Sequence, residues 1–211
     1  AARNVVLKRA GWNVEADGLF GAPPITVIVG AEVHPSVTKA LGVLGLGRNR
    51  VVQVPVDGQG RMRAEALPKI SGPTIVIVQA GNVNTGAFDP VGEICTRAHA
   101  AGAWVHVDGA FGLWAAASPA LRPLCAGIAA ADSWATDGHK GLIVPYDSGF
   151  VFVADPAAHR GAISYTASYI PTNSAVREQS DWNPAWARRA RGFATYAALR
   201  QLGRDGVAAM V

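Results

Sequence analysis

The sequence has little cysteine, little charge and no long apolar run, and each shortage narrows the classes of protein it could encode. Two cysteines in 211 residues are too few for a disulfide framework. Cys95 and Cys125 lie in apolar contexts, so we expect buried thiols and a reducing cytoplasm. No apolar stretch is long enough to cross a bilayer, and the first ten residues, AARNVVLKRA, contain no apolar signal core. These shortages predict a cytoplasmic protein without a membrane partner.

Patterns for other common ligands are also missing. The lysines form no run, and no stripe of aromatic and basic residues occurs. The basic cluster in WARRARG is interpreted as the polar face of a helix, although the net charge is +4. The five histidines show neither His-Glu-x-x-His nor Cys/His spacing, and no Gly-Lys-Ser/Thr phosphate loop or Gly-x-Ser-x-Gly elbow is found. We therefore expect neither a nucleic-acid partner nor a metal ion.

Six short runs rich in Val and Ile are present instead. Most of them do not alternate with polar residues, which is typical of strands buried on both faces. They span residues 25–30, 51–56, 74–79, 103–107, 132–136 and 149–153. Helical patterns lie between several of them, at residues 35–46, 64–70, 89–102 and 119–130, with Asp89 as the expected N-cap of the third. Alternating strands and helices predict an α/β fold with a mostly parallel sheet and helices on both faces.

The pattern changes at residue 184. The stretch from Pro184 to Val211 predicts one long helical segment with a glycine break. Such a helix is typical of a connection to a further domain. We therefore expect two parts: a partial large domain over residues 1–183, and a helix over residues 184–211 that leads towards a domain outside this sequence.

Polar residues follow four of the predicted strands. In a parallel sheet the carboxyl ends of the strands meet at one edge, where ligands usually bind. His34 follows the first strand, and Asn82, Asn84 and Thr85 follow the third. Asp108 follows the fourth, and Asp137, His139 and Lys140 follow the fifth. We therefore expect these side chains to form one site.

Each of these residues has a structural interpretation beside a chemical one. Lys140 is either a solvated turn lysine or an amine for Schiff-base chemistry, because desolvation and nearby cations favour the neutral amine. Asp108 either caps the following turn or faces a cation such as a protonated pyridine nitrogen. His34 is either satisfied at a helix start or stacks on a planar ring. His106 is interpreted as a core residue or as a neighbour of the site. Taken together, the chemical interpretations describe a pyridoxal phosphate site.

Five stretches carry a family resemblance. EVHPSVTKALGVLGLG, AGNVNTGAFDP, AWVHVDGAFG, DSWATDGHKG and DWNPAWARRARGF resemble, in this order, the group II pyridoxal-phosphate-dependent decarboxylases. These are fold type I enzymes that include aromatic amino acid and glutamate decarboxylases. The resemblance implies a partial fold type I large domain, pyridoxal 5'-phosphate as cofactor, and decarboxylation of an L-amino acid through a lysine Schiff base. It also implies a homodimer with sites at the subunit interface.

The resemblance assigns cofactor contacts to six positions. Lys140 would form the Schiff base and His139 would lie beside it. Asp108 would bind the pyridine nitrogen, so that the ring stays an electron sink. The rest of the ring would be contacted by His34, which stacks on it, Thr85, near its polar substituent, and Ala110, on the other face.

The resemblance also assigns a proton donor. Tyr169 falls where these decarboxylases carry a loop tyrosine that protonates the carbanionic intermediate, and Tyr165 is the neighbouring alternative. The catalytic residues implied by the resemblance are therefore Lys140, His34 and Tyr169.

Three departures from the family pattern keep alternatives open. The glycine- and serine-rich phosphate loop is expected upstream of this sequence, and with it much of the phosphate affinity. Asp137 replaces an Asn or Ser three residues before the lysine, and its carboxylate would repel a phosphate unless it points away. Gly138 and Gly141 flank the His-Lys pair and predict a looser turn. The alternatives are an aminotransferase, a carbon-carbon lyase, or an inactive fragment; an aminotransferase usually needs a small-domain arginine that this sequence lacks.

Overall fold

The computed structural model describes residues 1–165 and 177–211, and a six-stranded sheet forms their centre. The spatial order of the strands is β2-β1-β3-β4-β5-β6. The first five are parallel to their neighbours, and β6 is antiparallel to β5. The strands are β1 (Thr26–Gly30), β2 (Val51–Val54), β3 (Thr74–Gln79), β4 (Trp104–Asp108), β5 (Ser133–Asp137) and β6 (Gly149–Val153). Each strand lies within about two residues of its predicted run, and the predicted mostly parallel sheet is confirmed.

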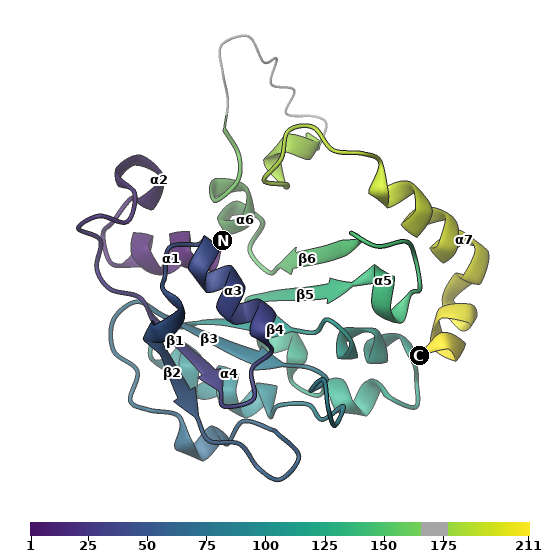
Figure 1. Cartoon of the computed structure of the whole chain (residues 1–211), viewed down its shortest axis with the longest axis horizontal. Helices are drawn as coiled ribbons and strands as arrows, with labels where there is room; N and C mark the ends of the chain where they lie inside the picture. Colours follow the sequence, from purple (N-terminus) through teal and green to yellow (C-terminus); the bar gives the residue numbers. More distant parts are fainter. Residues whose placement is uncertain (166–176) are drawn as a thin grey trace.

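Helices cover both faces of the sheet (Figure 1). They are α1 (Ala2–Arg9), α2 (Val14–Asp17), α3 (Pro35–Val43), α4 (Val91–Ala100), α5 (Gly138–Gly141), α6 (Pro156–Gly161) and α7 (Arg191–Met210). Successive strand residues point to opposite faces. One set of them packs with α4 in a core that includes Ile28, Val76, Val78, Val105 and Val107. The other set packs with α1 and α3 in a core that includes Val27, Val29, Ile75, Ile77 and Trp104. Burial on both faces explains why the strands read as continuous apolar runs.

Two predicted helices are wrong. Residues 64–70 and 119–130 contain only short 3-10 turns, at residues 64–66, 122–125 and 128–130. Pro68 and Pro123 lack the N–H group that a continuous α-helix needs. Gly127, with φ of +78°, adopts the left-handed conformation that ends a helix. Local backbone chemistry therefore overrides the apolar spacing in both segments.

Asp89 does not cap α4, contrary to the prediction. The N-cap position belongs to Pro90, and no side chain caps the helix. Asp89 Oδ1 instead accepts a hydrogen bond from the Met62 amide at 2.7 Å, and Oδ2 accepts one from the Gln79 amide at 2.7 Å. Burial raises the pKa of the Asp89 carboxyl, and the two backbone donors oppose that rise. The carboxylate therefore joins the end of β3 to the segment that contains Met62.

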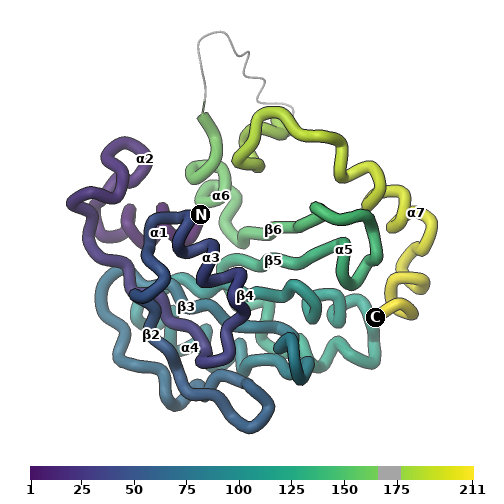
Figure 2. Tube along the Cα trace, viewed as in Figure 1, coloured from purple at the N-terminus to yellow at the C-terminus, as the bar shows by residue number. Residues whose placement is uncertain are grey.

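The C-terminal helix is shorter than predicted. It begins at Arg191 rather than near Pro184, and its regular geometry is interrupted at Gly203, where the predicted glycine break occurs. Val207 of this helix packs with Leu142 and Val144, which follow the Lys140 turn. Figure 2 shows α7 at the opposite side of the molecule from α1 and α2. Across residues 1–165 and 177–211, no helix combines the length and apolar character needed to span a membrane.

Asp89→Asn tests the role of the buried carboxylate. The amide keeps one acceptor oxygen, so one of the two backbone N–H groups loses its partner. We expect the free energy of unfolding to fall by about 1–3 kcal/mol, the usual cost of a buried unsatisfied donor. Urea denaturation followed by circular dichroism measures it.

Asp57→Asn is the matched control. Asp57 also accepts two backbone hydrogen bonds, from Gln59 and Arg61, but both reach Oδ1 in an exposed turn, so the amide oxygen of asparagine can keep both. A loss as large in this variant as in Asp89→Asn would contradict the assignment of the effect to an unsatisfied buried donor.

Candidate active site

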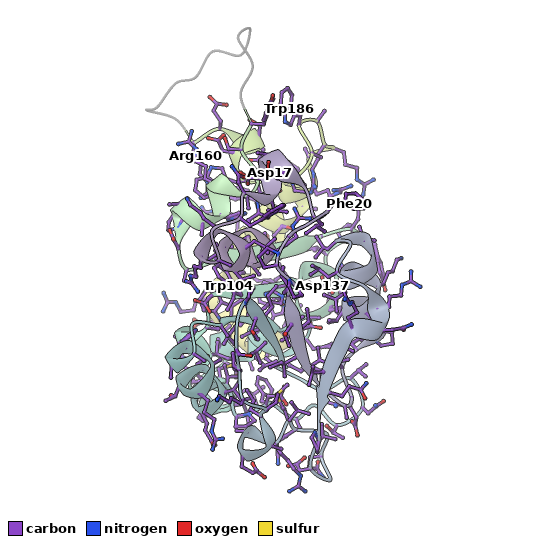
Figure 3. The ribbon with its side chains drawn as sticks, turned by 90° about the vertical axis from the view of Figure 1, so that its left-hand side faces the viewer. Asp17, Phe20, Trp104, Asp137, Arg160 and Trp186 are labelled. Carbon is purple, nitrogen blue, oxygen red and sulfur yellow. The ribbon has the colours of Figure 1, made fainter. Side chains whose placement is uncertain are left out.

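A cavity of about 360 Å³ lies at the carboxyl ends of the parallel strands. Residues at or just after the ends of β1, β3, β4 and β5 line it, as the strand order predicts. Its lining includes His34, Ser36, Gln79, His106, Asp108, Ala110, Phe111, Asp137 and Lys140. Figure 3 shows Asp137 in the central part of the molecule, whereas Phe20 and Trp186 lie near its outer boundary. The sequence prediction that these strand ends share one site is consistent with this geometry.

Lys140 reaches the cavity from α5, the short helix directly after β5. Its Nζ atom lies 2.9 Å from Asp137 Oδ2 and 4.5 Å from the centroid of the Phe111 ring. About a quarter of each charged side chain is exposed, 28% for Lys140 and 27% for Asp137. The amine is therefore held between a carboxylate and an aromatic face at the cavity wall, and it is not a freely solvated turn lysine.

Asp108 is the last residue of β4, and His106 lies two residues before it on the same face of the strand. Asp108 Oδ1 accepts a hydrogen bond from the Ala110 amide at 3.3 Å, so the predicted turn-capping contact is present. In the part of the chain that the structure describes, no Lys, Arg or His forms an ion pair with Asp108. This carboxylate can therefore receive a cation from a ligand.

His106 is bound to the sheet rather than to Asp108. Its Nδ1 atom lies 2.8 Å from Ser133 Oγ, which also accepts a hydrogen bond from Trp104 Nε1 at 2.8 Å. Burial lowers the pKa of His106, and the negative charge of Asp108 partly opposes the effect. A neutral imidazole at this position leaves the charge of Asp108 uncompensated within the cavity.

His34 is the N-cap residue of α3, and Pro35 is the first residue of that helix. Its ring Nδ1 accepts a hydrogen bond from the Ser36 amide at 3.3 Å, which fixes the imidazole at the start of the helix. Its backbone amide donates to Gln79 Oε1 at 3.2 Å, and Gln79 Nε2 donates to the Glu32 carbonyl at 3.3 Å. Gln79, at the end of β3, therefore fixes the segment that carries His34.

The other predicted site residues lie in different places. Ala110 lines the cavity, whereas Thr85 and His139 do not. The Thr85 hydroxyl donates to the Gln59 carbonyl at 2.7 Å. His139 stacks on Tyr146, with ring centroids 4.5 Å apart, and its Nδ1 atom lies 3.1 Å from the Ser148 carbonyl oxygen. Thr85 therefore has its partner away from the cavity, whereas His139 Nε2 also lies 3.7 Å from Asp137 Oδ2, which lines the cavity.

The predicted proton donor cannot be placed with them. Tyr169 lies outside the described residues. Its alternative, Tyr165, is 75% exposed and does not line the cavity.

Three contributions to the cavity were not found from the sequence. Phe111 beside Lys140, Gln79 beside His34 and the direct contact of Asp137 with Lys140 all depend on side-chain direction. The spacing of Asp137 and Lys140, three residues apart across a helix start, is the one local signal that could have indicated their pairing.

The glycines around Lys140 are not signs of a loose turn, contrary to the prediction. A Cβ atom at Gly141 would clash with the indole ring of Trp114, whose Nε1 donates to the Asp137 carbonyl at 3.0 Å. A Cβ atom at Gly138 would lie 2.9 Å from Phe150 and from the Ser148 hydroxyl. Both glycines therefore permit close packing, and that packing fixes the Lys140 turn.

The donor set suits an organic cation better than a metal. A primary amine, an imidazole and a carboxylate that forms no ion pair in the described part of the chain surround the cavity. Within residues 1–165 and 177–211, no group of three or more His, Cys, Asp or Glu side chains is placed to hold a metal ion.

Residues 8–211 match a family model, the pyridoxal-dependent decarboxylase conserved domain. The chain is similar to the aspartate 1-decarboxylase of Aliivibrio fischeri, with 34% identity over 185 residues, 80% of this chain and 34% of that protein. It is also similar to the acidic amino acid decarboxylase GADL1 of Mus musculus, with 31% identity over 219 residues, 98% of this chain and 40% of that protein. The chain thus spans about a third to two fifths of the length of these relatives.

Solved structures share the fold. A crystal structure of mouse CSAD superposes with a TM-score of 0.89 at 27% identity, over 99% of this chain and 45% of that one. The structure of Oryza sativa TDC with PLP and tryptamine has a TM-score of 0.85 at 24% identity, over 99% of this chain and 44% of that one. The predicted fold type I architecture is confirmed by these similarities.

Gly141→Ala tests the packing of the Lys140 turn. The added methyl group has to displace the Trp114 indole, so we expect a loss of about 1–3 kcal/mol in the free energy of unfolding. Chemical denaturation measures the change.

Gly161→Ala is the matched control. Gly161 ends α6 as Gly141 ends α5, but its Cβ position has no neighbour within 4 Å among residues 1–165 and 177–211. We expect unchanged or slightly higher stability for this variant. Equal losses in the two variants would show that the Trp114 contact does not restrict position 141.

Proposed function

Because the chain belongs to the pyridoxal-dependent decarboxylase family, we propose that it forms the cofactor-binding part of a decarboxylase that acts on an L-amino acid. The chain spans less than half of the relatives' length, so the activity belongs to the whole protein. One observation carries the proposal: a lysine amine, an aspartate that forms no ion pair among the described residues, and a histidine at a helix start line the same cavity.

The residues around the cavity fit pyridoxal 5'-phosphate by their chemistry. Lys140 supplies the primary amine that the aldehyde of the cofactor requires. Asp108 supplies an acceptor for a protonated ring nitrogen, and a buried carboxylate is stabilised by such a cation. His34 and Ala110 supply contacts for a planar ring. When bound, the cofactor would act as an electron sink for the bond that breaks at the α-carbon.

Each residue would then have a defined task. Lys140 would hold the cofactor through its amine. Asp108 would accept a hydrogen bond from the protonated ring nitrogen. His34, fixed by Ser36 and Gln79, keeps the ring plane in position. His139 and Thr85 support the surrounding loops, and Tyr169 is proposed as the proton donor to the α-carbon.

The setting of the whole protein is also part of the proposal. We infer a homodimer in the cytoplasm, in line with the family resemblance. Two observations agree with a reducing compartment: Cys95 and Cys125 are both free thiols, and burial raises the pKa of Cys95 to about 11, which makes it poorly reactive.

Borohydride reduction in the presence of pyridoxal 5'-phosphate tests the attachment site. Peptide mass mapping should find the pyridoxyl group on Lys140, and Lys140→Ala should abolish that adduct. Lys39→Ala is the control, because Lys39 is exposed on α3 and does not line the cavity. An adduct that persists at another residue in Lys140→Ala, or no adduct in the wild-type protein, would contradict the proposal.

Asp108→Asn separates cofactor binding from catalysis. The amide still accepts a hydrogen bond but cannot stabilise a ring cation. We expect the reduced adduct on Lys140 to persist. Carbon dioxide release, measured with an amino acid that the wild-type whole protein decarboxylates, should fall about 100- to 1,000-fold. This is the usual effect of removing one preorganised electrostatic partner. Unchanged turnover would limit Asp108 to the turn contact with Ala110.

A further inference from the structure

Trp104, Ser133 and His106 form a short chain of hydrogen bonds between β4 and β5, at the wall of the cavity. Trp104 Nε1 lies 2.8 Å from Ser133 Oγ, and the same oxygen lies 2.8 Å from His106 Nδ1. Trp104 and Ser133 are buried, and His106 pairs with Ser133 in the register of the two strands. Figure 3 shows Trp104 in the central part of the molecule. This chain of contacts is therefore part of the sheet, so it does not depend on what occupies the cavity.

The direction of these hydrogen bonds follows from what each atom can do. An indole N–H group only donates, so Ser133 Oγ is the acceptor in its contact with Trp104. The Ser133 hydroxyl has one proton of its own, and within residues 1–165 and 177–211 its acceptor is His106 Nδ1. If Nδ1 carried a proton, this buried hydroxyl would have no acceptor among those residues, which is costly. Ser133 therefore donates to Nδ1 of the imidazole.

A neutral imidazole that accepts at Nδ1 carries its proton on Nε2. Burial favours this neutral form, because it lowers the pKa of His106, although the charge of Asp108 opposes the shift. The two ring nitrogens point in diverging directions, so Nε2 points away from Ser133. Nε2 has no hydrogen-bond partner in the part of the chain that the structure describes, and His106 lines the cavity together with Asp108. The cavity wall therefore presents a donor on His106 and an acceptor on Asp108, two residues apart on one face of β4.

We propose that His106 is a positioning residue for Asp108, because Trp104 and Ser133 keep an Nε2–H group, and not a lone pair, available to the carboxylate. This inference rests on the proposed role of Asp108 as the partner of a ring cation. Asp108 Oδ1 already accepts a hydrogen bond from the Ala110 amide at 3.3 Å. A second donor on the same strand face attracts the carboxylate and restricts its rotation, so that its remaining acceptor positions stay directed into the cavity. The opposite tautomer would set a lone pair against the negative charge.

Nitrogen NMR measures the position of the proton without any cofactor. The whole protein is labelled with ¹⁵N-histidine, and the signals of His106 are identified by their absence in His106→Gln. At about pH 8, above the ordinary histidine pKa of about 6.5, we expect a protonated Nε2 and an unprotonated Nδ1. His34 is an internal reference with the same expected pattern, because its Nδ1 accepts from the Ser36 backbone amide, which can only donate. A proton on Nδ1 of His106 would overturn the proposal.

Ser133→Ala tests whether the hydroxyl fixes the proton. Without it, Nδ1 loses its partner, so we expect the proton of His106 to be shared between the two ring nitrogens. Ser148→Ala is the matched control and should leave the His106 signals unchanged, because Ser148 is also buried but its hydroxyl contacts Thr195 at 3.1 Å. An unchanged Nε2–H pattern in Ser133→Ala would contradict the role of Trp104 and Ser133.

A double-mutant cycle tests the action on Asp108, with the dissociation constant of pyridoxal 5'-phosphate from the whole protein as the readout. His106→Leu removes the donor, and we expect about tenfold weaker binding, the effect of one hydrogen bond to a charged group. His106→Gln should stay within about threefold of the wild type, because its amide nitrogen can take the place of Nε2. In an Asp108→Asn background, His106→Leu should change the constant by less than about twofold. Circular dichroism establishes that each variant is folded.

Two results of the cycle would also overturn the proposal. A loss in His106→Leu that persists in the Asp108→Asn background would mean that His106 acts through packing. A loss in His106→Gln as large as that in His106→Leu would mean that the ring shape matters and the donor does not. Failure of the proposed function is recognised separately: a missing borohydride adduct on wild-type Lys140 contradicts that function, whereas the NMR result does not depend on the cofactor.

Discussion

The site depends on the parallel arrangement of four neighbouring strands, because parallel strands bring their carboxyl ends to one edge. Residues distant in the chain, such as His34 and Lys140, line one cavity only because β1, β3, β4 and β5 end side by side. Apolar side chains on both faces of the sheet maintain this arrangement. His34 and Lys140 lie at the helix starts that follow β1 and β5, whereas Asp108 and Asp137 are the last residues of β4 and β5.

A network of polar contacts connects this edge to the core. Asp89 accepts hydrogen bonds from the Met62 and Gln79 amides, and the Gln79 side chain fixes the backbone of His34. On the other side of the cavity, the Trp114 indole fixes the Asp137 carbonyl and packs where Gly141 has no side chain. The two halves of the site are therefore positioned by separate contacts, one through β3 and the other through the turn after β5. A change in one half need not disturb the geometry of the other.

The sequence predicted the sheet well and the side-chain geometry poorly. Short runs of Val and Ile are strong signals of buried strands, and all six were located within about two residues. The helices predicted at residues 64–70 and 119–130 were wrong because apolar spacing does not reveal the effect of Pro68, Pro123 or a left-handed glycine. Partners depend on side-chain rotation and on distant segments. The contact between Asp137 and Lys140 and the packing of Gly141 against Trp114 could therefore not be derived from residue order alone.

The two carboxylates of the cavity, Asp108 and Asp137, differ in their charged partners. Asp108 forms no ion pair among the described residues and lies beside a histidine whose burial favours its neutral form, so its charge is available to a cationic ligand. Asp137 already has a cation, the Lys140 ammonium group. The two carboxylates are therefore assigned to different partners: Asp108 can accept a cation that a ligand brings, whereas Asp137 contacts a cation of the protein itself.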